Sequence, residues 1–114
     1  MHIDKNAKKK IFDISHGSWL SGLFSAIPSF IPNITFSEHK QIFFKLVEEW
    51  LNDGKIKFDY PPLEQYAGKT GFWDADNATI MAYLQDGFPK HATDELDMDV
   101  NLYFYEIAPP VCWL

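Results

Sequence analysis

The segment at residues 35–60, TFSEHKQIFFKLVEEWLNDGKIKFDY, predicts an amphipathic helix, a glycine stop and a short strand. From Ile42 to Leu51, apolar side chains recur at i, i+1, i+4, i+5, i+8 and i+9, which makes one broad stripe on a helix. Thr35 and Glu38 have the T-x-x-E spacing of a capping box. Gly54 is expected to end the helix, because glycine enters the left-handed conformation without steric cost. This unit predicts where a core forms.

The pattern on either side of this unit predicts two further helices and two further strands. Residues 11–27 carry a second helical stripe that includes Trp19. The proline-containing residues 28–33 are expected to connect this helix to the one that starts at Thr35, so that the two form an antiparallel pair. Another helix is expected from Asp74 or Asp76 to Leu84, after a loop at residues 63–71. Residues 100–107, VNLYFYEI, alternate as a central strand, and residues 111–114 are expected to pack back as an edge strand or tail.

These elements together predict an α+β fold in a single domain over residues 1–114. Two or three helices would pack on a small, mainly antiparallel sheet, and residues 1–10 would be frayed. A chain of 114 residues with 46% hydrophobic and 17% aromatic residues can bury one core.

The charge of the chain is uneven along its length. Residues 1–57 contain eight lysines and six acidic residues, a net of +2, and residues 58–114 contain two lysines and ten acidic residues, a net of −8. Every basic residue is lysine, so the arginine contacts typical of nucleic-acid binding are absent, and no nucleic-acid partner is expected. The acidic half would attract a basic protein surface.

The sequence also suggests where the protein resides. No apolar run reaches the ~18–20 residues that a membrane helix needs, and the segment after the N-terminal lysines is too polar for a signal peptide. The single cysteine, Cys112, has no partner for an internal disulfide and is expected to be a buried, inert thiol. We therefore expect a cytoplasmic protein with no membrane partner.

The residues that usually carry catalysis form no recognisable motif. The four histidines are scattered without metal-ligand spacing, and His39 is expected on the surface of its helix. The acids Asp94, Glu95, Asp97 and Asp99 resemble a calcium loop only superficially, because the required glycine and glutamate are missing. We expect no metal, no cofactor and no enzymatic activity.

Several stretches of the C-terminal half resemble a small bacterial family of unknown function, some of whose members are immunity proteins of contact-dependent or other polymorphic toxin systems. The likeness covers roughly residues 35–114 and is carried by GKIK at 54–57, GFWD at 71–74, FP at 88–89, DELD at 94–97, LYFY at 102–105 and VCW at 111–113. The resemblance implies that the chain neutralises a cognate, basic toxin domain by direct contact. It transfers no catalytic residue.

The leading functional prediction is therefore a non-enzymatic protein-binding module with an acidic, aromatic-rich surface. One alternative is a homo-oligomeric accessory domain, with a homodimer formed through an exposed edge of the strand at 100–107. Another is a small hydrolase that uses clustered acids or a metal. The residues expected to face the partner are Asp74, Asp76, Tyr83, Asp94, Glu95, Asp97, Asp99 and Tyr103.

Overall fold

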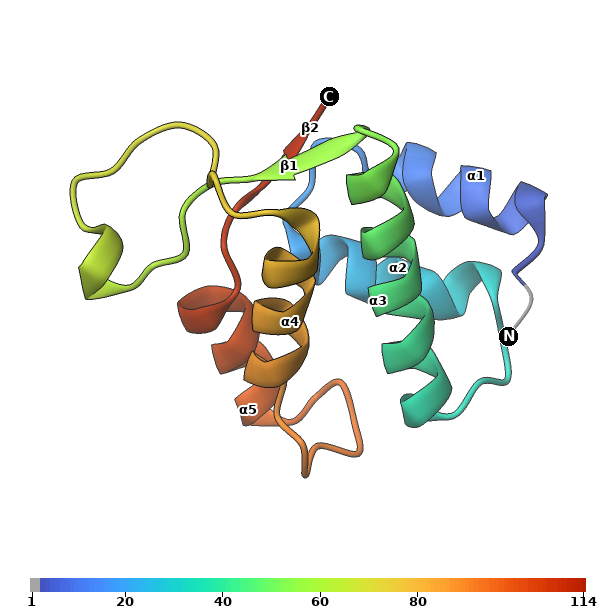
Figure 1. Cartoon of the computed structure of the whole chain (residues 1–114). Helices are drawn as coiled ribbons and strands as arrows, with labels where there is room; N and C mark the ends of the chain where they lie inside the picture. The colour runs from blue at the N-terminus through green and yellow to red at the C-terminus, as the bar shows by residue number, and fades with distance from the viewer. Residues whose placement is uncertain (1–2) are drawn as a thin grey trace.

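Helices dominate the computed structural model, which describes residues 3–114 (Figure 1). The described chain has five α-helices, and its one sheet has two short antiparallel strands. The predicted α+β class, with helices packed on a larger sheet, is therefore wrong. In chain order the elements are α1 (Lys5–Ser15), α2 (Leu20–Phe30), α3 (Phe36–Asn52), β1 (Ile56–Phe58), the 3-10 turn η1 (Glu64–Tyr66), α4 (Asn77–Gly87), α5 (Met98–Leu102), the π-helical turn η2 (Tyr103–Ile107) and β2 (Val111–Trp113).

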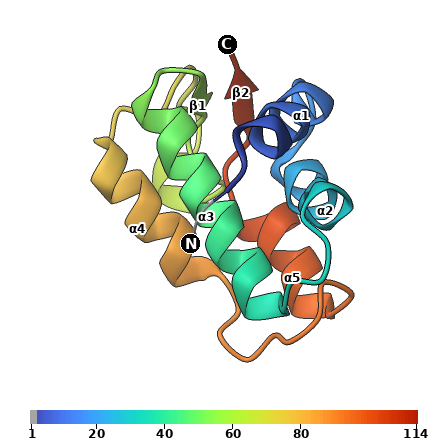
Figure 2. The ribbon, with the colours of Figure 1, turned by 90° about the vertical axis from the view of Figure 1, so that its right-hand side faces the viewer.

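The central helix α3 forms as its sequence predicts. Thr35 caps it: the backbone N–H of Thr35 donates to Glu38 Oε1 at 2.9 Å, and the N–H of Glu38 donates to Thr35 Oγ1 at 3.1 Å. Gly54 follows the helix with φ +74°, the conformation that favours glycine. The apolar stripe is buried, and α3 contacts α2, α4 and β1 (Figure 2).

The N-terminal third differs from its prediction. Residues 5–10 are helical rather than frayed, because Asp4 accepts a hydrogen bond from the Asn6 N–H and Ile11 is fully buried. Met1 and His2 lie outside the described residues. The single helix expected at 11–27 is two helices, since the chain turns at Gly17 with φ +86°.

Pro28 lies inside α2, although it was expected in the connection after that helix. A proline has no N–H for the carbonyl four residues earlier, which here belongs to Phe24. His39 replaces that donor: its Nε2–H donates to the Phe24 carbonyl oxygen at 2.6 Å. The His39 ring also stacks on the Phe24 ring, with centroids 3.8 Å apart.

The prediction that His39 is a surface residue is therefore wrong, because its side chain is only 4% exposed. The helix pair it joins is also arranged differently. Figures 1 and 2 show α2 crossing α3 steeply instead of running antiparallel to it.

The expected central strand at residues 100–107 is helical. Val100, Tyr103, Phe104 and Ile107 follow the i, i+3, i+4, i+7 spacing of a helix face, and this face packs on the core. The residues of VNLYFYEI also fit an alternating strand pattern, so the helical spacing is not recognised from the sequence. The last turn is π-helical, with the Ala108 N–H donating to the Tyr103 carbonyl oxygen at 2.8 Å.

The predicted return of the C-terminus is confirmed. β2 pairs antiparallel with β1, with Ile56 opposite Trp113 and Phe58 opposite Val111. Ile56 and Phe58 are buried as expected, and the Trp113 ring lies 6.0 Å from that of Trp50. Cys112 lies between these positions and is partly exposed, so the expectation of a fully buried thiol is wrong.

Candidate partner-binding site

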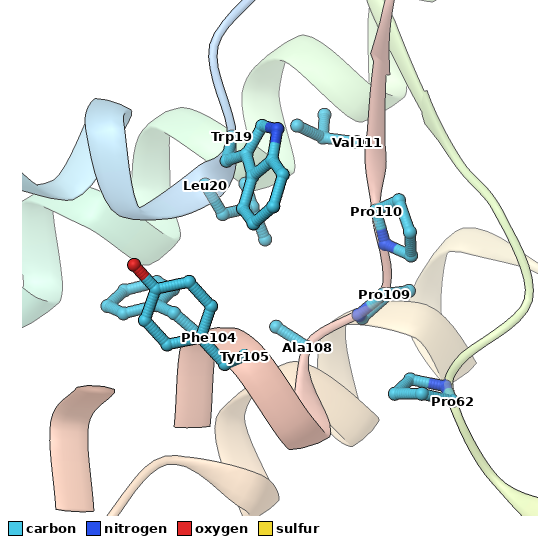
Figure 3. Close-up of a pocket in the computed structure, with 9 residues that line it drawn as sticks. All are labelled: Trp19, Leu20, Pro62, Phe104, Tyr105, Ala108, Pro109, Pro110 and Val111. Atoms are coloured by element: carbon cyan, nitrogen blue, oxygen red, sulfur yellow. The ribbon is translucent and has the colours of Figure 1, made fainter. Parts of the chain in front are cut away.

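An apolar groove of about 340 Å³ opens where α2, β2 and the continuous α5 and η2 turns at residues 98–107, here called the C-terminal helix, meet (Figure 3). Trp19 and Tyr105 form one wall, and Pro62 and Pro110 lie on the opposite side (Figure 3). The side chains around it offer only two polar atoms, the Trp19 indole nitrogen and the Tyr105 hydroxyl oxygen. The groove is therefore suited to an apolar group. Its full lining is Trp19, Leu20, Pro62, Phe104, Tyr105, Ala108, Pro109, Pro110 and Val111.

Trp19 stands out from the surface because of the break between α1 and α2. After the turn at Gly17, Trp19 is the N-cap residue of α2, with extended backbone angles, and its side chain is 69% exposed. The preceding residue is fixed in place, since the Trp113 indole N–H donates to the Ser18 carbonyl oxygen at 2.7 Å. The backbone next to Trp19 is thus held by β2, while the Trp19 ring remains exposed to solvent.

Tyr105 completes this wall from the C-terminal helix. Its ring is 63% exposed and packs edge-on against Trp19, with centroids 6.1 Å apart. Tyr105 lies within the π-helical turn, a rare geometry that occurs often at functional sites. Leu102 and Met98, one and two turns earlier on the same helix, are also exposed, at 43% and 75%. The apolar surface therefore continues from the groove along this helix.

Two hydrogen bonds, one buried and one partly buried, hold the C-terminal helix against α4. The Tyr103 hydroxyl donates to the Leu84 carbonyl oxygen and the Tyr83 hydroxyl donates to the Ile107 carbonyl oxygen, both at 2.7 Å. Burial raises the pKa of both tyrosines, with a smaller contribution from a neighbouring tyrosine in each case. Both hydroxyls therefore stay protonated and keep donating.

Gly87 permits this close approach. A Cβ atom at Gly87 would lie 2.7 Å from Cγ2 of Ile107, so only glycine leaves room for the two helices as they stand. The position of Tyr105, and so the shape of the groove, depends on this contact and on the two tyrosine bonds.

The acids expected to face a partner do not form one patch. Asp74 and Asp76 lie at the start of α4, whereas the acids at 94–99 lie beyond its other end (Figure 1). The 11 residues of α4 separate the two groups by about 16 Å. A single partner surface built from all of them would have to span that whole face.

Three of these acids have a local structural role. Asp76 accepts from the Thr79 N–H, Asp94 from the Leu96 N–H and Asp97 from the Asp99 N–H, each at 2.8 Å. The hydrogen bond from the Thr79 backbone, with a further one from its side chain, lowers the pKa of Asp76. Asp74, Glu95 and Asp99 are exposed and have no such capping bond among the described residues.

The two tyrosines expected as anchors have little surface to offer. Tyr103 is fully buried, so it has no exposed surface for a partner, and Tyr83 is half-buried with its hydroxyl occupied. Reasoning from the sequence instead missed Trp19 and Tyr105 as a pair. They are 86 positions apart, and Trp19 fits the stripe of a helix that in fact begins one residue later. The turn signal His16-Gly17-Ser18 could have revealed this.

A shallower hollow of about 270 Å³ lies at the start of α3 and brings His39 near Thr93, Asp94 and Glu95. Burial lowers the pKa of His39, and the hydrogen bond to Phe24 and the charge of Glu95 offset only part of that effect. Over residues 3–114, no group of three or more histidine, cysteine or acidic side chains is arranged to hold a metal ion. Within the same residues, no helix is both long enough and apolar enough to cross a membrane.

No family model matches the chain, and searches of the curated proteins and of the solved structures found no match.

Proposed function

We propose that this protein is a non-enzymatic binding module of the bacterial cytoplasm that neutralises a toxin by direct contact. The observation that supports the binding role is the exposed pair Trp19 and Tyr105, whose rings wall an apolar groove. Exposed apolar patches rimmed by polar residues mark interaction sites, and Trp and Tyr dominate the binding energy of protein interfaces.

The toxin as partner is supported by the resemblance of the stretches at residues 54–113 to the small bacterial family of unknown function, some of whose members are immunity proteins. The charge of the chain agrees with that role. Its net charge is −6, and an acidic surface accelerates association with a basic protein.

Co-expression tests this proposal. The chain is produced in a bacterium together with the toxin domain encoded by the adjacent gene, and growth is measured. We expect the wild-type chain to restore growth. The variants Trp19→Ser and Tyr105→Ser should fail to do so, although each replaces an exposed side chain and should fold normally.

The matched control is Phe72→Ser. Phe72 is an exposed aromatic residue at 45%, but it lies under Lys57 beside β1 and does not line the groove. The Phe72→Ser variant should restore growth as the wild type does. Failure of the wild-type chain to bind or neutralise any adjacent toxin domain would contradict the proposal.

A further inference from the structure

We infer that the groove receives a segment of the partner protein that presents a large apolar side chain flanked by lysine or arginine. This inference rests on the proposed binding function and specifies the chemistry of the bound segment.

The shape of the groove favours a side chain carried on another protein over a small molecule. Small-molecule sites enclose about 70–90% of their ligand. Here both rings of the wall remain mostly in water, at 69% for Trp19 and 63% for Tyr105. The floor is apolar and packed, with Leu20 and Ala108 buried. An open groove of this kind can hold an anchor residue while the rest of the partner covers the rim.

The charge around the groove specifies the residues beside that anchor. The residues that line the groove come from three parts of the chain, which together with their neighbours in sequence are residues 16–24, 59–66 and 98–114. They contain no lysine, and their four acids are all exposed. These acids are Asp59, Glu64, Asp99 and Glu106.

Carboxylates therefore lie close in sequence to Pro62 on one side of the groove and to Tyr105 on the other, and a cationic flank would be attracted to them. It could also lie over the exposed rings of Trp19 and Tyr105, where a cation is attracted by the aromatic face. An acidic flank would be repelled by these same carboxylates. The charge pattern therefore selects basic over acidic partners at the same apolar anchor.

The experiment follows the indole N–H of Trp19 by nuclear magnetic resonance in the ¹⁵N-labelled chain, with Trp19→Phe to assign the signal. Three blocked peptides serve as probes: a Leu-Phe centre flanked by arginines, the same centre flanked by glutamates, and a Ser-Ser centre flanked by arginines. We expect only the first to shift the Trp19 signal strongly. The other two should bind at least about tenfold more weakly, because each lacks one half of the complementarity.

Two variants localise the effect. Tyr105→Ser should weaken binding of the first peptide by at least about tenfold, the loss expected for an aromatic anchor, whereas Phe72→Ser should leave it unchanged. The inference is overturned if the arginine peptide leaves the Trp19 signal unmoved, if the glutamate peptide binds equally well, or if Tyr105→Ser binds like the wild type. Self-association of the free chain that Tyr105→Ser abolishes, seen by sedimentation, would overturn it in favour of a second copy as the occupant.

The outcomes separate this inference from the proposed function. Toxin neutralisation without peptide selectivity would reject the inference and leave the function standing. Peptide selectivity without any adjacent toxin partner would reject the toxin and retain the basic, apolar segment as the ligand.

Discussion

His39 shows how a single residue can serve a structural role that its sequence context conceals. Its helix position next to a polar face predicts a surface histidine, yet Pro28 leaves the Phe24 carbonyl without a donor and His39 supplies one. A buried carbonyl without a partner costs roughly 1–3 kcal/mol, which explains why a polar ring is tolerated in this core. The pairing joins residues 15 positions apart and has no local sequence signal.

The protonation of His39 should make the fold sensitive to pH. Its pKa is below the ordinary value of 6.5 in the folded chain, so below about pH 6.5 the unfolded chain binds more protons. Stability is therefore lost as the pH falls through this range. His39→Gln keeps an amide N–H for the Phe24 carbonyl and cannot titrate. Urea unfolding between about pH 7.5 and about pH 5.5 should show a smaller loss of unfolding free energy in this variant than in the wild type.

The exposed residue His91 provides the control, and His91→Gln should lose stability over this pH range as the wild type does. Equal losses in His39→Gln and the wild type would show that His39 does not carry the effect.

At the scale of the element, the helix at residues 98–107 shows how a sequence pattern can predict the wrong secondary structure. The stretch VNLYFYEI fits both a strand period and a helix period. Its β-branched and aromatic residues favour a strand. Tertiary contacts favour the helix: Tyr103 and Ile107 pack against α4, and the Phe104 ring lies 5.8 Å from that of Phe43 in α3. By contrast, α3 and β1 were predictable because their caps, periods and glycine stop agree.

Gly87→Ala tests the closeness of this helix pair. Alanine normally stabilises a helix relative to glycine, but here its Cβ would meet Ile107 Cγ2 at 2.7 Å. We expect a loss of about 1–3 kcal/mol in the unfolding free energy, measured in urea. Combined with Ile107→Ala, the change should cost less than the sum of the two single effects. Additive costs would show that the two positions do not press on each other.

Tyr103→Phe tests the hydrogen bond between the same helices. Removing the hydroxyl leaves the buried Leu84 carbonyl without that donor and should cost about 1–3 kcal/mol of stability. Tyr105→Phe, in the same turn but with an exposed ring, should be close to neutral. The same thermal or urea unfolding measurement serves both variants, and equal effects would contradict the assigned roles.

At the scale of the whole molecule, the acidic side chains of the C-terminal half have two roles. Some accept local backbone hydrogen bonds, and others only add negative charge to the surface. Asp76 caps α4, as the sequence predicts for Asp74 or Asp76, whereas Asp97 caps α5 and Asp94 closes a turn with the Leu96 N–H. The groove could not be predicted, because it exists only where three segments distant in the sequence meet. The candidate acids therefore need separate tests according to their place in the fold.

Association kinetics provide that test of charge. The double variant Asp99→Asn with Glu106→Gln removes two carboxylates beside the apolar surface. With the adjacent toxin domain as partner, we expect the association rate at low salt to fall by about threefold and its salt dependence to weaken, because steering is lost. Asp74→Asn, in the loop before α4, changes a residue that does not line the groove and should leave both unchanged. A larger effect at Asp74 would move the contact surface to that end.

The most direct test of the groove as the contact surface is the affinity of the Tyr105→Ser variant for the proposed toxin partner, measured by titration calorimetry beside the wild-type chain. Our account predicts at least about a tenfold loss of affinity with an unchanged unfolding midpoint, because the ring is an exposed anchor and not part of the core. Wild-type affinity in a folded Tyr105→Ser variant would contradict it.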